Sequence, residues 1–391
     1  MLADKLFYKT LLKNMFSDPF EIKFLDGSEE KYGEGISKFK VIFNEQILKG
    51  DIINNPSVTF GEAYMTKKID IEGRLQSVVE SLYNNKESFL KKSAKYQNLI
   101  RKIKSSIKKN KDNIEFHYDI GNDFYKLWLD RGMNYSCGYF NNDTDSLNEA
   151  QSNKINHILT KLNLEQGQSL LDIGCGWGEL IIRAAKQYKV RAIGITLSKE
   201  QFQKVNERIK AEGLENLVEV KLQDYREIKN ISFDRIVSIG MLEHVGEENL
   251  PEYFNIINNL LKDKGLSLIH CITGVNEGGN NTWIDKYIFP GGHVPAIKNI
   301  ITYIAEQEFE LLDVESLRRH YAKTLEHWAE NFEKTLPIIE KSKDETFIRM
   351  WRLYLNSCAA SFNCGNVNLH QILFAKGVNN DLPLTRDYMD K

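Results

Sequence analysis

The chain has 391 residues, which is long for a single hydrophobic core and favours two domains. Its formal net charge of −2 excludes bulk electrostatic binding of nucleic acid, and a hydrophobic content of 42% is ordinary for a globular protein. The five cysteines form no C-x-x-C pair, which argues against a disulfide framework and against a zinc or other metal site.

The first residues carry Lys5, Lys9 and Lys13 where a signal peptide would be apolar, and no apolar run reaches the length that spans a bilayer. We therefore expect a cytoplasmic protein that is at most peripheral on the inner face of the cell membrane. Residues 1–90 mix a helical start with strand-like runs at 21–25 and 38–43. This pattern predicts a small α+β domain, which we assign to docking on lipid.

A basic segment follows this domain. Residues 91–111 contain nine Lys or Arg residues and no acidic residue, so we place a linker helix at 91–114. Its apolar residues recur at helical spacing, which predicts an amphipathic helix on anionic lipid; a solvated helix between domains is the alternative. A second candidate apolar face comprises Leu2, Leu6, Phe7, Met15 and Phe16.

Residues 115–391 are predicted to form the catalytic domain. From about residue 168, apolar runs alternate with helical segments, which predicts parallel β/α units. We expect helices at 179–188, 199–212, 247–262 and 297–307, and two long ones between residues 323 and 362. Strands are expected at 169–173, 190–195, 217–222, 233–239, 265–272, 309–314 and 368–375. Seven strands in this order predict a doubly wound α/β sheet.

A glycine-rich loop is the strongest local signal. The strand at 169–173 leads into Gly174-Cys175-Gly176-Trp177-Gly178, and such glycines let the backbone approach a ligand at the carboxyl edge of the sheet. A purely structural turn between strand and helix is the alternative. A dinucleotide site would space its glycines as G-x-G-x-x-G and place an acid after the second strand. Residues 194–198 (GITLS) contain no acid, so NAD is disfavoured.

Several motifs carry a family resemblance. Asp172–Gly178 resembles the first motif of class I S-adenosylmethionine-dependent methyltransferases. Residues 1–90, including the DIEG sequence at 70–73, resemble the extra N-terminal domain of the phospholipid-modifying branch of the cyclopropane-fatty-acid and mycolic-acid cyclopropane synthase group. The segments that resemble that group are 116–140, 194–201 (GITLSKEQ), 222–226 (LQDYR), 241–246 (MLEHVG), 289–295 (FPGGHVP) and 356–364.

The resemblance covers residues 115–391 and implies a seven-stranded class I methyltransferase sheet. It further implies transfer of a methylene unit from S-adenosylmethionine to the cis double bond of unsaturated acyl chains in membrane phospholipids, which forms cyclopropane fatty acids. The partner would then be a phospholipid bilayer, and the resemblance leaves room for a homodimer.

Ten residues are implied as cofactor contacts. The glycine loop would approach the methionine part, residues 135–136 its carboxylate end, and residues 196–201 the ribose. Asp224 would accept a hydrogen bond from the adenine amino group, although an acid in a loop after a strand also serves as a turn or helix cap. The implied contacts are Tyr135, Ser136, Gly174, Cys175, Gly176, Thr196, Leu197, Gln201, Asp224 and Tyr225.

The chemistry sets further requirements. A sulfonium carbon is electrophilic enough to methylate an alkene, and ring closure then needs a base to remove a proton from the new methyl group. Aromatic faces would tolerate the intervening cation. Residues 116–140 are dense in aromatic side chains, several of which we expect in the core: Phe116, Tyr118, Phe124, Tyr125, Trp128, Tyr135, Tyr139 and Phe140.

The resemblance implies that a bicarbonate ion is the base. Glu243 would accept a hydrogen bond from it, and both Glu243 and His270 belong to the carboxyl ends of neighbouring strands. A helix-capping acid and a core histidine are the alternatives for these two residues. The implied bicarbonate contacts are Cys137, Glu243, His270, the backbone of Ile272, and Tyr321.

Cys358 matches a cysteine treated as an active-site residue in the family, although its helical setting beside two alanines equally fits a packed thiol. Two other functions remain open. One is methyl transfer to a lipid alkene or a small-molecule amine without ring closure, which the combination of Glu243, His270 and Tyr321 disfavours. The other is a non-catalytic lipid-binding protein on a methyltransferase fold, which the intact cofactor motifs disfavour.

Overall fold

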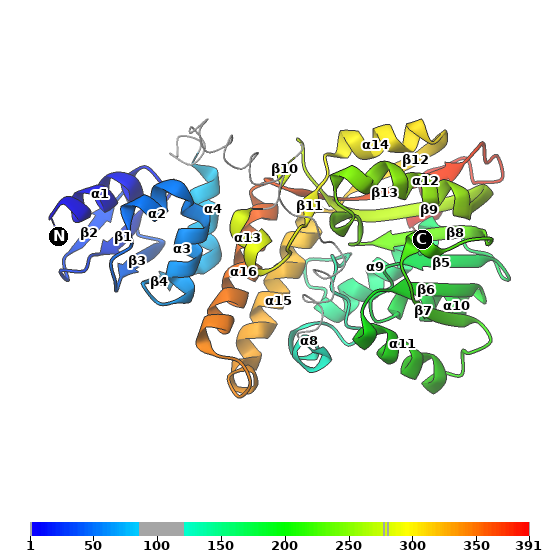
Figure 1. Ribbon diagram of the computed structural model, residues 1–391, viewed down its shortest axis with the longest axis horizontal. Helices are drawn as coiled ribbons and strands as arrows, with labels where there is room; N and C mark the ends of the chain where they lie inside the picture. The colour runs from blue at the N-terminus through cyan, green and yellow to red at the C-terminus, as the bar shows by residue number, and fades with distance from the viewer. Residues whose placement is uncertain (1, 86–120, 277, 280, 391) are drawn as a thin grey trace. The chain divides into compact units, whose positions relative to one another are not determined.

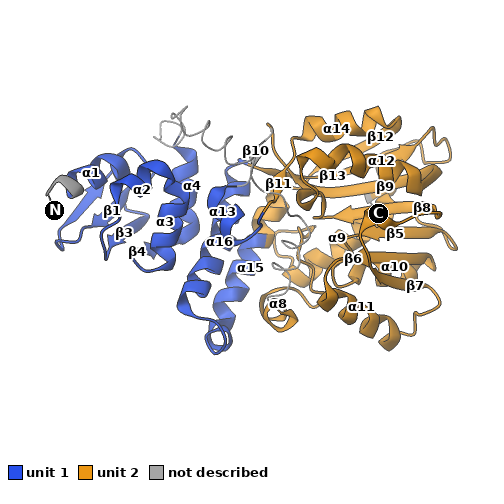
Figure 2. Ribbon diagram, in the orientation of Figure 1, with its two compact units in different colours: residues 1–108, 279–290, 325–366 blue, residues 109–278, 291–324, 367–391 orange. Residues whose placement is uncertain are grey.

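The computed structural model describes residues 2–85, 121–276, 278–279 and 281–390, which fall into two compact units (Figures 1 and 2). Unit 1 comprises residues 1–108, 279–290 and 325–366; unit 2 comprises residues 109–278, 291–324 and 367–391. The predicted linker helix at 91–114, with Phe116 and Tyr118, lies outside the described residues. Within the described ranges, no helix has both the length and the apolar character needed to cross a membrane.

Unit 1 contains a four-stranded sheet of order β2-β1-β3-β4, in which only β1 and β3 run parallel. Alternate residues of β3 face the core, as the period of a half-buried strand requires. This confirms the predicted α+β character of the N-terminal region. Its elements are α1 (Leu2–Lys13), β1 (Phe20–Lys23), β2 (Glu29–Tyr32), β3 (Phe39–Phe43), α2 (Lys49–Asn54), α3 (Pro56–Met65), β4 (Ile69–Gly73) and α4 (Leu75–Asn84).

Most residues of the second candidate apolar face, at the N-terminus, pack in or against the core of unit 1. Met15 is buried, and Phe7 and Phe16 pack against the same core, because α1 lies on the sheet and turns these side chains inward. Leu6 instead remains 66% exposed. The described residues of this face therefore do not form a continuous exposed stripe along α1.

Unit 1 also recruits later parts of the chain, which differs from the predicted boundaries at residues 90 and 115. These parts are α13 (Thr282–Tyr287), α16 (Glu345–Asn363) and the portion of α15 (Arg318–Ile339) after Thr324. Trp283 lies over Gly61 of α3, where a Cβ atom would come within 2.3 Å of the indole ring. The buried Arg349 of α16 donates to the backbone oxygen atoms of Tyr64 and Ile69.

Unit 2 contains a seven-stranded sheet of order β12-β13-β9-β8-β5-β6-β7, which confirms the predicted class I methyltransferase fold. Strand β13 runs antiparallel to both neighbours, and the remaining adjacent pairs are parallel. The strands are β5 (Ser169–Ile173), β6 (Arg191–Thr196), β7 (Val218–Leu222), β8 (Phe233–Ile239), β9 (Leu261–Thr273), β12 (Phe309–Ser316) and β13 (Asn368–Lys376); short strands β10 (Gly278–Gly279) and β11 (His293–Val294) lie between β9 and β12 in the sequence.

Helices cover both faces of this sheet (Figure 1). Successive residues of β5 point to opposite faces, so Leu170 packs with α9, α10 and α11, whereas Leu171 packs with α12 and α14. The helices of the unit are α8 (Asn122–Trp128), α9 (Leu147–Lys161), α10 (Glu179–Tyr188), α11 (Lys199–Ala211), α12 (Leu250–Leu260), α14 (Ile297–Glu306) and the first turns of α15; 3₁₀ turns are η2 (Tyr225–Glu227), η3 (Leu242–His244), η4 (Glu247–Asn249) and η5 (Arg386–Asp390).

The region after β8 departs from the predicted boundaries. The helix expected at 247–262 starts at Leu250, with Pro251 in its first turn, and residues 247–249 form the separate 3₁₀ turn η4. The strand expected at 265–272 begins earlier, at Leu261. The carboxyl ends of β5, β6 and β8 then open into the loops that form the site.

Candidate cofactor pocket and the adjoining polar cluster

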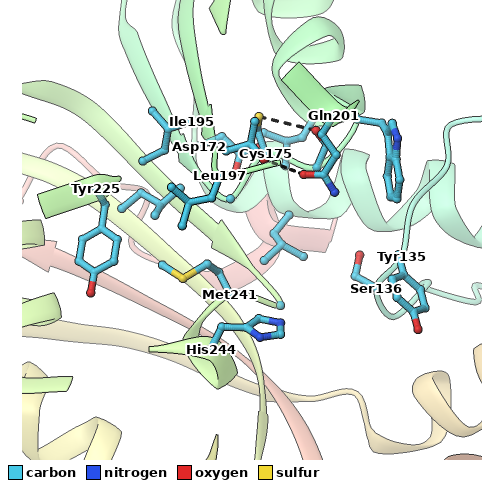
Figure 3. A pocket seen from close by; sticks show the side chains of 18 of the residues that line it. Tyr135, Ser136, Asp172, Cys175, Ile195, Leu197, Gln201, Tyr225, Met241 and His244 are labelled. Atoms are coloured by element: carbon cyan, nitrogen blue, oxygen red, sulfur yellow. Dashed lines mark hydrogen bonds between the residues drawn. The ribbon is translucent and has the colours of Figure 1, made fainter. Parts of the chain in front are cut away.

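A pocket lies at the carboxyl edge of the sheet in unit 2 (Figure 3). Tyr135 and Ser136 lie at one end of it and Tyr225 at the other, while Met241 and His244 line it between them. All ten residues implied as cofactor contacts line this one pocket: Tyr135, Ser136, Gly174, Cys175, Gly176, Thr196, Leu197, Gln201, Asp224 and Tyr225.

The glycine loop is pinned to the sheet by its backbone. The amides of Gly174 and Cys175 both donate to the carbonyl oxygen of Ile195, at 3.1 and 3.0 Å. Gly176 adopts φ +53°, and a Cβ atom placed on it would meet no described atom within 4 Å. Gly178 instead allows close packing, because its Cβ atom would lie 2.8 Å from Val205 of α11. Gly176 is therefore the glycine that borders open pocket space.

Hydrogen bonds fix the wall formed by β6 and α11. The hydroxyl of Thr196 donates to the Gln201 side-chain oxygen at 2.7 Å and accepts from the Ser198 amide at 3.1 Å. The Ser198 hydroxyl caps α11 by accepting from the Gln201 amide. Thr196 and Gln201 are thus held in place as a pair on the pocket wall.

Asp224 caps a short helical turn, as the alternative interpretation of this residue expected, and it also lines the pocket. Its Oδ1 accepts from the backbone amide of Arg226 at 3.0 Å, which caps η2. Both carboxylate oxygens also bind the Arg226 guanidinium, at 3.0 and 2.6 Å, and this hydrogen bonding raises the pKa of Arg226. Burial raises the pKa of the neighbouring Tyr225 to about 12, so its hydroxyl stays protonated.

Sequence reasoning missed a buried lysine at the other end of the pocket. Lys154 of α9 is 2% exposed, lines the pocket, and donates from Nζ to the Ser136 hydroxyl at 3.0 Å. Burial lowers its pKa to about 8, against the opposing effect of nearby acids such as Asp130 and Asp172. The available signal was its spacing on α9, because Lys154 and Lys161 lie seven residues apart on the buried face.

Glu243 lies beside this pocket, in η3. Its Oε1 accepts from the backbone amide of Ile272 at 2.6 Å, while its Oε2 is buried with no hydrogen-bond partner among the described residues. Burial raises the pKa of Glu243 to about 7. The helix-capping alternative is wrong, because the capping position of α12 is Asn249. Ile272 therefore positions Glu243 through its amide rather than offering that amide to a ligand.

His270 lies two residues before Ile272 in β9, opposite Gln371 of β13. The Gln371 side-chain nitrogen and His270 Nδ1 are 3.3 Å apart, and His270 Nε2 is buried with no partner in the described part of the chain. Burial lowers the pKa of His270 well below its usual value, so the ring is neutral. Because the Gln371 amide donates to Nδ1, Nε2 carries the ring proton and is a hydrogen-bond donor.

The backbone brings Cys137 and Tyr321 toward the same region. The Cys137 sulfur lies 3.9 Å from the Leu317 carbonyl oxygen, and the Tyr321 amide donates to that same oxygen at 3.1 Å. The Leu317 amide in turn donates to the carbonyl of Leu369, which is paired with Ile272 across β13 and β9. Backbone hydrogen bonds and strand pairing thus connect the segments that carry the five residues implied as bicarbonate contacts, which we call the polar cluster: Cys137, Glu243, His270, Ile272 and Tyr321.

The polar cluster adjoins the cofactor pocket through two short segments. Ser136 lines the pocket, while Cys137 beside it is fully buried, and burial raises the pKa of its thiol. Likewise Met241 and His244 line the pocket, while Glu243 between them bonds to β9. Each segment therefore contributes to both the pocket and the cluster.

Cys358 lies in α16 and belongs to unit 1, whereas the other site residues belong to unit 2. Burial raises the pKa of its thiol to about 12, so it is protonated at neutral pH. This environment fits a packed thiol and disfavours a nucleophilic thiolate.

The aromatic segment divides between core and pocket. Phe124, Tyr125 and Trp128 are buried, whereas Tyr135 lines the pocket with its ring 5.4 Å from that of Tyr125. Tyr139 stacks between two histidine rings, at centroid distances of 4.2 and 4.8 Å.

Across the described ranges, no group of three or more His, Cys, Asp or Glu side chains is placed to hold a metal ion.

Comparisons with known proteins agree with this architecture. A family model described as mycolic acid cyclopropane synthetase matches residues 105–372, and one described as a domain of unknown function matches residues 7–94. A probable fatty acid methyltransferase of Pseudomonas putida is 37% identical over 388 residues, which cover 95% of this chain and 96% of that relative. The cyclopropane-fatty-acyl-phospholipid synthase of Escherichia coli K12 is 42% identical over 271 residues, which cover 69% of each chain.

A solved structure of the mycolic acid cyclopropane synthase CmaA1, complexed with SAH and CTAB, matches with a TM-score of 0.65 and 35% identity, over 69% of this chain and 99% of that chain. The family model spans more than half of the chain, and the matched segment contains both the pocket and the polar cluster. Membership of an enzyme family argues against a non-catalytic lipid-binding protein. The chain belongs to the mycolic acid cyclopropane synthetase family of S-adenosylmethionine-dependent enzymes.

Proposed function

We propose that this chain transfers a methylene unit from S-adenosylmethionine to the cis double bond of unsaturated acyl chains in membrane phospholipids, and that bicarbonate is the base. The observation that carries the proposal is the polar cluster beside the pocket. There, Glu243 Oε2 is an acceptor and His270 Nε2 is a donor, and both are buried without partners among the described residues. Plain methyl transfer to an amine needs no such pair.

The residues of the pocket fit S-adenosylmethionine. Gly176 leaves space where any other residue would place a Cβ atom, and the pocket runs from the polar Ser136 end to the aromatic Tyr225 end. A solved relative contains SAH, the demethylated form of this cofactor. Asp224 lines the Tyr225 end of the pocket, and its carboxylate, which also binds Arg226, would accept a hydrogen bond from an adenine amino group there.

When bound, the cofactor would supply an electrophilic methyl group to the alkene, and loss of a proton from that carbon closes the ring. The polar cluster has the donor and acceptor that a bicarbonate ion requires. His270 Nε2 would donate to one bicarbonate oxygen, and Glu243 Oε2 would accept from the O–H group. A third oxygen of the ion then takes the proton from the methyl carbon, which discharges the cation on the lipid. The neutral His270 ring and the protonated thiol of Cys137 add no further charge beside the ion.

Phospholipid is the proposed substrate because of the N-terminal region. The E. coli relative is named for phospholipid, and residues 1–90 resemble the extra N-terminal domain of the phospholipid-modifying branch. Unit 1 also exposes three leucines, Leu6, Leu25 and Leu48, by 66%, 48% and 65%, and we refer to these three residues as the leucine patch. An ion pair of 2.7 Å joins Lys5 to Asp26, and Lys49 lies 5.5 Å from the Phe7 ring, so the neighbours of these leucines are in contact. Apolar side chains among lysines suit an anionic bilayer.

A second candidate is methyl transfer to a lipid alkene without ring closure. It is favoured by one observation, the name of the P. putida relative that spans 95% of this chain, a probable fatty acid methyltransferase. Its product would keep a double bond, whereas cyclopropanation removes the double bond.

The test is mass spectrometry of phospholipids from cells that express the protein. We expect monounsaturated chains to gain the mass of one CH₂ group and to resist ozonolysis. A gain of the same mass with a cleavable double bond would instead establish the second candidate. Lipids without any gain in mass would contradict both.

A further inference from the structure

Lys154 is a buried charged residue of the pocket wall, and the hydrogen bonds of its amine to described residues are all to neutral partners. Nζ lies 3.0 Å from the Ser136 hydroxyl and 3.4 Å from the side-chain oxygen of Asn134. Among the ion pairs of the described residues, none within 4 Å involves Lys154. The side chain is nevertheless only 2% exposed and lines the pocket.

The same helix shows how a buried lysine is normally accommodated. Lys161, two turns further along α9, is equally buried and binds Asp313 at 3.0 Å and Glu315 at 2.6 Å. A buried charge without a counter-ion is costly, and the cost falls when an anion binds beside it. Lys154 is therefore a cation at the wall of a pocket that lacks the anion its neighbour on α9 possesses.

Two of the nearby acids, Asp130 and Glu179, do not serve as that anion, because their oxygens are already bonded elsewhere. Asp130 accepts from the backbone amides of Asn134 and Gly132, at 2.7 and 2.8 Å. Glu179 pairs with Arg183 and Arg208. Asp172 also lines the pocket, and its Oδ1 is buried with no partner in the described part of the chain.

The pocket thus combines an uncompensated cation at the Ser136 end with the carboxyl group of Asp172, whose Oδ1 has no described partner, elsewhere on its wall. Such a pair matches a zwitterion that carries one carboxylate and one ammonium group. We propose that Lys154 binds the α-carboxylate of the methionine part of S-adenosylmethionine, with the Ser136 hydroxyl beside it and Asp172 facing the ammonium group. This assignment rests on the proposed function, and it adds to the site a residue that the family motifs in this sequence do not contain.

The experiment is isothermal titration calorimetry with S-adenosylhomocysteine and its decarboxylated analogue, S-adenosyl-3-thiopropylamine, which differ only in the carboxylate. We expect wild-type protein to prefer S-adenosylhomocysteine, and Lys154→Met to lose about 10- to 100-fold in affinity for it, the usual value of a charged hydrogen bond. Affinity for the decarboxylated analogue should not fall. The ratio of the two affinities isolates the contact between Lys154 and the carboxylate.

Two further variants make the outcome decisive. Lys154→Gln keeps a donor for Ser136 and replaces the Met variant if that protein does not fold. Lys161→Gln alters the other buried lysine of α9 and should leave the ratio of affinities unchanged. An equal loss for both ligands in the Lys154 variants would make the residue a structural support and overturn the inference. Failure of the wild type to bind S-adenosylhomocysteine at all would instead overturn the proposed function.

Discussion

The two carboxyl oxygens of Glu243 have different environments. The Ile272 amide holds Oε1 at 2.6 Å, and Oε2 is buried without a partner among the described residues. Burial raises the pKa of Glu243 to about 7, so the group changes its protonation near neutrality. A carboxyl group that is fixed through one oxygen and has no partner at its second oxygen is suited to orienting a small ion.

Glu243→Gln tests this role at the level of turnover. The amide keeps an oxygen for Ile272 but cannot present a negative charge to bicarbonate, so we expect turnover to fall about 10²–10⁴-fold. Affinity for S-adenosylhomocysteine should remain that of the wild type, because Glu243 does not line the pocket. Initial rates measured in degassed buffer, with and without added bicarbonate, complete the test. Wild-type rates that ignore bicarbonate would refute the assignment of the base.

The same substitution predicts a change in stability with pH. The pKa of Glu243 is raised in the folded protein, from 4.5 to about 7, so the folded state retains a proton that the unfolded state releases between these values. The wild type therefore loses stability as pH rises through this window, and Glu243→Gln does not. Urea unfolding at pH 5 and pH 8 should show the variant gaining about 2–3 kcal/mol relative to the wild type, at about 1.4 kcal/mol per pKa unit. A difference that is independent of pH would contradict the buried environment.

At the scale of elements, the sequence predicts the strands of the sheet, but it does not predict where the helices and strands around the site begin and end. The strand at 233–239 is a continuous apolar run, and the structure has it at the predicted residues. The helix predicted at 247–262 is shorter at its start, because Pro251 lies in its first turn and the preceding residues form η4. The association of α16 with unit 1 was also not predicted, because hydrogen bonds between Arg349 and residues almost 300 positions earlier leave no local pattern.

The candidate site divides in the same way. The ten residues implied as cofactor contacts lie in contiguous motifs, which made them predictable, and all ten line the one pocket. Lys154 and Gln371 were missed, because each lies in an element whose local sequence fits ordinary helix or strand packing. Their importance arises from partners far away in the sequence, Ser136 for the lysine and His270 for the amide.

The loop between β5 and α10 yields a prediction at this scale. Gly176→Val should abolish binding of S-adenosylhomocysteine, because the side chain would fill the pocket space that the backbone leaves open. Gly213 is the matched control, since it has a similar φ of +64° and a Cβ atom on it would likewise meet no described atom within 4 Å, yet it lies outside the pocket. Calorimetry should find wild-type affinity in Gly213→Val. Equal affinities in both variants would remove the glycine loop from the site.

At the scale of the whole molecule, the two units divide the proposed work. Unit 2 holds the cofactor pocket and the polar cluster, and unit 1 carries the leucine patch. The basic segment at 91–111 lies outside the described residues, and its contribution to lipid binding stays a prediction from the sequence. A protein that alters acyl chains must reach them in a bilayer, so docking is a requirement of the proposed function rather than an addition to it.

Docking can be tested by co-sedimentation with vesicles that contain anionic phospholipid. Leu6→Glu combined with Leu48→Glu should release the protein, because two exposed apolar side chains become negative. Val378→Glu is the matched control, since Val378 is 68% exposed but belongs to unit 2. Replacing the basic residues of 91–111 by Gln should weaken the dependence on salt. If the double leucine variant pellets like the wild type, docking does not use the leucine patch.

The most direct measurement follows the methyl hydrogens of the cofactor into the lipid. Purified protein would be incubated with S-adenosylmethionine carrying a CD₃ group, bicarbonate, and vesicles of a monounsaturated phospholipid, and the acyl chains analysed by mass spectrometry and proton NMR. Ring formation predicts a product that retains two of the three deuterium atoms and shows no vinyl protons. A product that retains all three deuterium atoms together with a double bond would contradict cyclopropane synthesis by this protein.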